Sequence, residues 1–223
     1  MCLTPEPPGA FLIWTGKTFR DGLRVGYSEW SAAWMTNERS RVVLVHHGET
    51  AWSRDRRHTG RTDIPLTPQG EAQAAALAPR LAAWTFSHIL VSPLVRAGRT
   101  ADLAGLPGRE ITPDLVEWDY GDYEGRTTTA IRADHPGWDL FGDGVPGGES
   151  IHQVATRVDR VIARIRADSG DVACVAHAHL LRIFAARWLE VDPVSARYLV
   201  LGPASVSVLG WEREQPVLEH WNT

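Results

Sequence analysis

Apolar and polar positions follow two alternating periods along most of the chain. Short, continuous apolar runs are typical of buried strands. Such runs lie at residues 42–45, 89–91, 172–176, 206–209 and 216–218. Between them apolar residues recur at helical spacing, most clearly over 151–165, where Ser150 and Gln153 have the spacing of a capping box. Strands that alternate with helices predict an α/β fold, a three-layer α/β/α sandwich with a mostly parallel central sheet.

Two hydroxyl–proline pairs, Thr67-Pro68 and Ser92-Pro93, mark further helix starts. A hydroxyl N-cap followed by proline in the first turn predicts helices to about Ala83 and about Ala104. Another helix is expected over about 180–189. Glycines and prolines gather between Trp118 and Gly148, and a connection of that length is typical of a lid or substrate loop.

The first 34 residues show neither period and contain three prolines and three tryptophans. Met35 then opens a short polar lead into the first strand. We therefore predict that residues 1–40 are an N-terminal extension to a domain at 41–223, with Met35 as the true start of translation. A loosely packed arm that is translated is the alternative, because tryptophan is uncommon in disordered tails.

Composition indicates which partners and which location to expect. With 223 residues, 43% of them hydrophobic, the chain can bury a substantial core. The net charge of −4 gives no positive field for a nucleic acid or an anionic membrane, and no apolar run reaches the length of a membrane span. Two cysteines, Cys2 and Cys174, make no disulfide framework, so a cytoplasmic location is expected. Whether the chain forms homo-oligomers stays open.

Candidate catalytic residues come after the predicted strands and at the start of the long connection. They occur in the segments His46-His47-Gly48-Glu49-Thr50, Arg57-His58-Thr59-Gly60, Ser92-Pro-Leu-Val-Arg96, Glu117-Trp-Asp-Tyr-Gly121 and His177-Ala-His179. Because the carboxyl ends of parallel strands meet at one edge of a sheet, these segments are expected to form a single site. Arg96, in the first turn of a predicted helix, would add a guanidinium to a helix N-terminus, which suits an anion.

The order and spacing of these segments, from Arg41 to about Leu209, resemble the histidine phosphatase superfamily, in its phosphoglycerate mutase-like branch. Thr67-Pro-Gln-Gly70 and Pro146-Gly-Gly-Glu-Ser150 are further matching landmarks. The resemblance implies a phosphoglycerate mutase-like fold and hydrolysis of a small phosphorylated metabolite through a phosphohistidine. It implies no metal and no cofactor, since side chains supply positioning and positive charge.

The same resemblance assigns catalytic roles to four residues. His47 matches the nucleophile that attacks phosphorus, and Arg96 matches the arginine that grips the phosphoryl oxygens. His177 matches the histidine that stabilises the transferring group. Glu117 matches the general acid that protonates the leaving oxygen and then activates water. Phosphate binding is expected at His46, Ser53, Thr59 and Gly60. Glu149 and Arg157 are expected to be structural, and His58 and His179 to support the site from behind.

His46 departs from the family, which has an arginine at this position. Histidine is shorter, has fewer donors and is mostly uncharged at neutral pH. The loss of one preorganised donor costs on the order of 3 kcal/mol of transition-state stabilisation, which slows an enzyme without abolishing its activity. We hypothesise that a protonated His46 binds phosphate, which would favour turnover at acid pH.

Three alternatives remain at this stage. A phosphoglycerate mutase would return the phosphoryl group to another hydroxyl. A catalytically impaired protein would only bind a phosphorylated ligand, as the missing arginine suggests. A metal-dependent hydrolase would use His46, His47, His177 and His179 as ligands. Hydrolysis of a modestly charged monoester is favoured over mutation, because the compact segment between Gly125 and Gly148 carries Asp134, Asp139 and Asp143 against two arginines.

Overall fold

A computed structural model describes residues 39–223, in which six strands form one sheet in the order β3-β2-β4-β1-β5-β6. The strands are β1 (Val42–His46), β2 (Phe86–Val91), β3 (Glu110–Ile111), β4 (Asp171–Ala176), β5 (Val206–Glu212) and β6 (Gln215–His220). The first four run parallel, and β5 and β6 add antiparallel pairings. The sheet is therefore mostly parallel, as predicted. The predicted N-terminal extension lies outside the described residues except at its last two positions.

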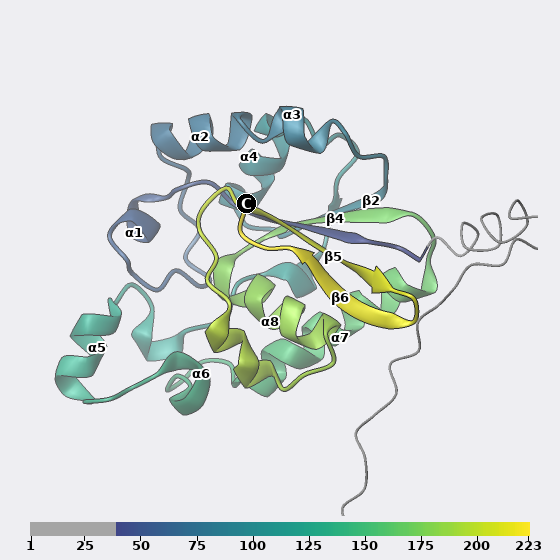
Figure 1. Cartoon of the computed structure of the whole chain (residues 1–223). Coiled ribbons are helices and arrows are strands. Elements are labelled where there is room, and N and C mark those ends of the chain that lie inside the picture. The colour runs from purple at the N-terminus through teal and green to yellow at the C-terminus, as the bar shows by residue number, and fades with distance from the viewer. Residues whose placement is uncertain (1–38) are drawn as a thin grey trace, which may run out of the picture. The chain divides into compact units, whose positions relative to one another are not determined.

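Helices cover both faces of this sheet (Figure 1). One layer contains α2 (Pro68–Ala75), α3 (Ala78–Leu81) and α4 (Val95–Leu103), and the other contains α7 (Ile151–Ala167) and α8 (Ala178–Trp188). Alternate residues of β1 enter the two cores: Val43 and Val45 pack in the first, Val42 and Leu44 in the second. Because successive side chains of a strand point to opposite faces, one apolar run serves both cores. The three-layer α/β/α prediction is confirmed.

Two predicted helices differ from those observed. The helix expected over 67–83 is divided into α2 and α3, since Pro79 has no N–H to donate to Ala75, where α2 ends. The helix expected from Ser92 begins at Val95, and Leu94 is its N-cap without a side-chain bond. Ser92 instead places its hydroxyl 2.7 Å from His177 Nε2. The capping box at Ser150 and the helix that follows it are confirmed.

The long connection between η1 (Pro113–Leu115) and α7 folds into short elements at one end of the sheet (Figure 1). These are η2 (Gly121–Tyr123), α5 (Thr128–Asp134) and α6 (Leu140–Asp143). The buried ion pair between Glu149 and Arg157 anchors its beginning, because Glu149 also accepts N–H bonds from Trp118 and Asp119. The expected structural role of this pair is confirmed.

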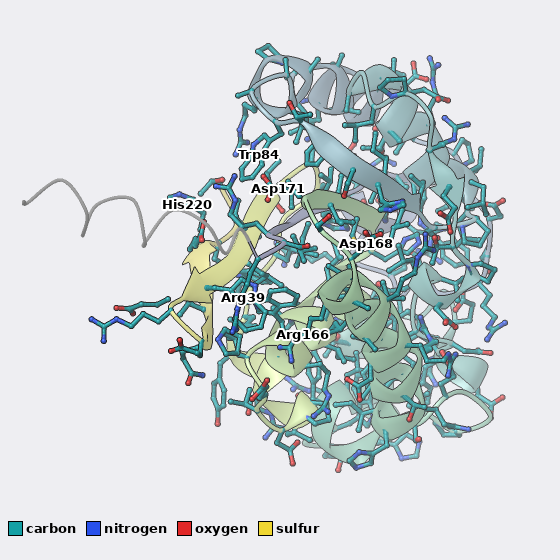
Figure 2. The ribbon with its side chains drawn as sticks, turned by 90° about the vertical axis from the view of Figure 1, so that its right-hand side faces the viewer. Arg39, Trp84, Arg166, Asp168, Asp171 and His220 are labelled. Carbon is teal, nitrogen blue, oxygen red and sulfur yellow. The ribbon has the colours of Figure 1, made fainter. Side chains whose placement is uncertain are left out.

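The opposite end of the sheet is held by exposed charges. Asp171, at the start of β4, pairs with Arg41, whose guanidinium lies 4.5 Å from the ring centre of Trp84. Asp171 and Trp84 are labelled in Figure 2. The remaining short elements are α1 (Ala51–Arg54) and η3 (Pro193–Tyr198). A search of the described helices finds none with the length and apolar character that crossing a membrane requires.

Candidate active site

The carboxyl ends of β1, β2 and β4 bring the candidate residues together. His47 follows β1, Ser92 follows β2 and His177 follows β4. The parallel register pairs Val91 with Val175 and His46 with Ala176, so the three strand ends are level. Gly48 is required at this point, because a Cβ there would lie 2.3 Å from the carbonyl oxygen of Gly70. That contact accounts for the glycines in two of the sequence landmarks.

The His47 ring is held with one nitrogen available for reaction. Nδ1 lies 2.7 Å from the carbonyl oxygen of Gly48, which can only accept, so Nδ1 carries the proton. Nε2 therefore has a lone pair, and the Nε–H of Arg96 donates to it over 3.2 Å. Burial, and then the neighbouring His46 and Arg96, lowers the pKa of His47 well below its usual value. This lowered pKa favours the neutral imidazole, which is the form that can act as a nucleophile.

Arg96 is fully buried and bound to the backbone. Its Nη1 donates to Thr62 O over 3.0 Å, and its Nη2 donates to Gly60 O over 2.9 Å and to Thr59 O over 3.2 Å. This fixes the guanidinium against His47 Nε2, the predicted point of phosphoryl attachment. The sequence correctly placed Arg96 in the first turn of a helix, but not these carbonyl partners.

His177 carries an unpaired polar atom beside the nucleophile. Its Nε2 bonds with Ser92, and its ring centre lies 5.1 Å from that of His47. Within residues 39–223, His177 Nδ1 is the buried side-chain nitrogen or oxygen that has no hydrogen-bond partner. A buried polar atom without a partner is costly, so its place in a functional site points to a ligand.

Glu117 caps helix α8 with its side chain. Oε1 accepts the N–H groups of Trp118 and Leu180, each over 2.9 Å, and Oε2 accepts that of His179 over 3.1 Å. Burial raises the pKa of Glu117 although these three donors lower it. With a single donor, Oε2 retains room for a proton, which a general acid needs.

His46 is bound through the nitrogen that a neutral ring must protonate. Its Nδ1 donates to Gly202 O over 2.7 Å, and burial lowers the pKa of His46 to about 4. At neutral pH the ring therefore has a lone pair on Nε2 and is an acceptor there, whereas the arginine expected from the resemblance would be a permanent donor. Protonation of Nε2 at acid pH would convert it into a donor.

A cavity of about 240 Å³ joins these groups. Its buried residues, here called the floor, are His46, His47, Glu117 and Tyr120. Its half-buried or exposed residues at α1 and the following turn, here called the rim, are Ser53, Arg56, Arg57, His58 and Thr59. Thr128, Ala178 and His179 complete the lining. The predicted residues His46, His47, Ser53, Thr59 and Glu117 thus share one cavity.

Three predicted residues do not line it. Arg96 and His177 lie behind His47, each in contact with its ring. Gly60 is buried: its N–H donates to Glu124, and a Cβ there would lie 2.5 Å from Trp118 O. The glycine therefore serves close packing, and its expected place at the cavity wall is not observed. Ser53 lines the cavity, but its hydroxyl is bonded to the backbone of Thr50 in a capping box.

Arg56 and Thr128 line the cavity although sequence reasoning did not select them. Arg56 has φ 58°, a left-handed conformation that the pattern of apolar and polar residues does not predict. Thr128 comes from helix α5, which is remote in the sequence. The sequence feature that could have pointed to Arg56 is its position next to Arg57. His58 and His179, expected behind the site, also line the cavity.

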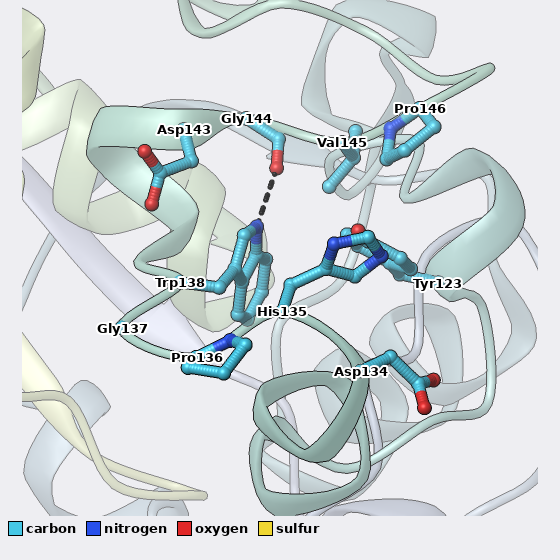
Figure 3. Close-up of a pocket in the computed structure, with 10 residues that line it drawn as sticks. All are labelled: Tyr123, Asp134, His135, Pro136, Gly137, Trp138, Asp143, Gly144, Val145 and Pro146. Atoms are coloured by element: carbon cyan, nitrogen blue, oxygen red, sulfur yellow. Dashed lines mark hydrogen bonds between the residues drawn. The ribbon is translucent and has the colours of Figure 1, made fainter.

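A second, larger cavity of about 680 Å³ lies within the long connection (Figure 3). Asp134, His135, Trp138 and Asp143 line it together with Tyr123. It contains none of the predicted catalytic residues. In the described part of the chain, no group of three or more His, Cys, Asp or Glu side chains is placed to hold a metal ion.

Comparisons with known proteins agree with this geometry. A model of the histidine phosphatase superfamily (branch 1) matches residues 42–223. The chain belongs to the histidine phosphatase superfamily. An acid phosphatase of Mycobacterium tuberculosis (strain ATCC 25618 / H37Rv) is 39% identical over 176 residues, covering 77% of this chain and 87% of that protein.

Other phosphatases are similar to the chain as well. A sedoheptulose 1,7-bisphosphatase of Saccharomyces cerevisiae is 34% identical over 182 residues, 66% of this chain and 67% of that one. The solved structure of a mycobacterial glucosyl-3-phosphoglycerate phosphatase with VO3 has a TM-score of 0.75 at 30% identity, covering 82% of this chain and 99% of that chain. The phosphoglycerate mutase-like fold is thus shared with phosphatases.

Proposed function

We propose that this chain hydrolyses a small phosphomonoester through a phosphohistidine formed on His47. The observation that carries the proposal is the environment of His47 Nε2: a neutral nitrogen at the cavity floor, with the Arg96 Nε–H 3.2 Å away and the unpaired His177 Nδ1 on an adjacent ring. A phosphoryl group on Nε2 would replace the bond from Arg96, and both groups could then donate to the phosphoryl oxygens. The names of the similar phosphatases support the same reaction class.

The reaction takes two steps. His47 Nε2 attacks phosphorus, and the ester oxygen leaves with the proton of Glu117. The Glu117 carboxylate then takes a proton from water, whose oxygen attacks phosphorus and releases inorganic phosphate from His47. His177 donates to the transferring group when Ser92 donates to its Nε2, because Nδ1 then carries the hydrogen.

Hydrolysis is preferred over the mutase reaction on account of the rim. The cavity that His47 lines has the exposed residues Arg56 and Arg57 at its rim, so this cavity opens to the surface. A mutase must exclude water to pass its phosphoryl group to a second alcohol. The cytoplasm remains the proposed location; Cys174, the cysteine within the described residues, is buried and free.

The pKa shifts set the direction of the pH dependence. His47 must be neutral, which its lowered pKa permits in acid, and Glu117 must be protonated, which its raised pKa favours in weak acid. Turnover is therefore expected to rise from pH 8 to pH 5, and to fall again only where His47 gains a proton.

The test is p-nitrophenyl phosphate hydrolysis between pH 4 and 9 in a chelator, by wild type, His47→Ala and His88→Ala. His88 is an exposed histidine paired with Asp168 away from the cavity, so His88→Ala controls for the loss of a histidine. Activity that is lost only in His47→Ala supports the proposal. Activity that survives in His47→Ala, or that chelator removes, contradicts it. Turnover by His46→Arg but not by wild type would favour the impaired binding protein.

A further inference from the structure

The cavity rim has two arginines without a carboxylate partner. Arg56 and Arg57 line the cavity beside the floor residues, and neither pairs with an Asp or Glu in the described part of the chain. Within residues 39–223, the Arg57 side chain makes one hydrogen bond, a long one of 3.5 Å to Gly125 O. By contrast, the arginines on either side in the sequence, Arg54 and Arg61, pair with Asp55 and Asp119.

The backbone of Arg56 adds a second observation. Its φ of 58° lies in the left-handed region, which costs a residue with a Cβ about 1 kcal/mol or more and which glycine adopts freely. A long cationic side chain therefore occupies a position where glycine would be easier to accommodate. A strained position in a cavity wall is a ground for seeking function in its side chain.

The nearby carboxylates bind other groups and make no ion pair with Arg56 or Arg57. Glu124 accepts the N–H groups of Gly60 and Thr62, and Asp63 accepts that of Val95. The acids of the long connection, on which we based the expectation of a modestly charged substrate, are also occupied. Asp134 pairs with Arg126 and Asp139 with Arg197, and neither lines this cavity.

We propose that Arg56 and Arg57 form a second anion subsite, so that the preferred substrate is a phosphomonoester carrying a further phosphate or carboxylate. This inference rests on the proposed function, because it takes the floor as the seat of the reacting phosphoryl group. Guanidinium groups bind both anions through paired N–H donors.

Matched substrates measure the effect of the second anion. Glucose 1,6-bisphosphate is compared with glucose 6-phosphate, and 3-phosphoglycerate with glycerol 3-phosphate. We expect wild type to show a kcat/KM at least tenfold higher for the member with two anionic groups in one of the pairs. The pair that shows this preference identifies the second anion as phosphate or carboxylate. In Arg56→Gly with Arg57→Gln, this ratio should fall about tenfold. Arg54→Gln removes one guanidinium group outside the cavity and should keep the ratio.

Binding by calorimetry to His47→Ala separates this inference from the proposed function. If wild type turns over no compound but the ligands with two anionic groups bind more tightly through Arg56 and Arg57, the subsite stands and the hydrolysis proposal fails. Equal values within both pairs, or a preference that survives the double substitution, would overturn the subsite. A p-nitrophenyl phosphate efficiency that falls in the double variant as much as that of the substrate with two anionic groups would also overturn it, since the arginines would then bind the reacting group.

Discussion

The floor and the rim of the cavity differ in how their side chains are held. On the floor, His46, His47 and Glu117 are at most 5% exposed, and each is bonded to backbone groups. On the rim, Arg56 and Arg57 are exposed and have few partners. The reaction is the same for every phosphomonoester and needs catalytic groups at fixed distances from phosphorus. Selection among substrates instead needs side chains that extend to the rest of the molecule. We therefore assign reaction to the floor and selectivity to the rim.

Glu117→Gln should give the largest effect among the substitutions that follow. Without its proton, an alkyl phosphate such as glycerol 3-phosphate should lose about a thousandfold in kcat. p-Nitrophenyl phosphate should lose less in the first step, because nitrophenolate leaves without a proton. Steady-state and pre-steady-state rates with both substrates check this. Equal losses in the first step would contradict the assignment of Glu117 as the acid.

His46→Arg tests the hypothesis that the floor is weakened by a histidine at the position where the resemblance leads us to expect an arginine. An arginine is charged at every working pH, whereas burial lowers the pKa of His46 to about 4. We expect kcat/KM for p-nitrophenyl phosphate at pH 7 to rise roughly tenfold to a hundredfold, with a smaller rise at pH 5. His46→Gln, a neutral control, should give no rise. A folded His46→Arg protein with unchanged or lower efficiency would refute the hypothesis.

Ser92→Ala should act on the floor through His177. Without the hydroxyl, His177 Nε2 loses its partner and the proton is no longer directed to Nδ1. We expect kcat to fall about tenfold with little change in KM, and Ser92→Thr to restore most of it. A change confined to KM or to thermal stability, with kcat retained, would show that Ser92 is only structural.

Replacement of the rim residue His58 should change the stability of the protein, and its expected effect on turnover is the smallest. Burial lowers its pKa from 6.5 to about 4, so the unfolded chain binds the proton more readily. Its contribution to stability is complete above pH 6.5 and is lost as pH falls towards 4. Between pH 7 and pH 5, wild type should lose about 2 kcal/mol more unfolding free energy than His58→Gln. Urea titrations at both pH values measure this; equal losses would contradict the buried, neutral state of His58.

The strand ends explain how much of the floor was predictable. An apolar run that stops at His46-His47 predicts a strand and also predicts that the site lies at the carboxyl end of that strand. The same holds for His177 after β4. Ser92 was misinterpreted because a serine before proline looks the same whether it caps a helix or bonds a distant histidine. The break at Pro79 was missed because alanines on both sides continue the helical pattern.

The rim was less predictable. Arg56 enters the cavity through one left-handed residue, and Thr128 through the packing of α5, neither of which has a period in the sequence. Conversely, Gly60 seemed to be a phosphate contact, but close packing against Trp118 decides its place. Tertiary contacts of single residues determine such positions, and local pattern does not report them.

Trapping the phosphorylated protein tests the central claim most directly. Glu117→Gln mixed with p-nitrophenyl phosphate should accumulate the intermediate, since nitrophenolate leaves unaided while water lacks its base. After an alkaline quench, mass spectrometry should find one phosphate on His47. Acid should remove it, and Glu117→Gln combined with His47→Ala should not acquire it. The account would be contradicted if wild type hydrolyses p-nitrophenyl phosphate but no protein-bound phosphate is found on Glu117→Gln. An acid-stable phosphate on another residue would also contradict it.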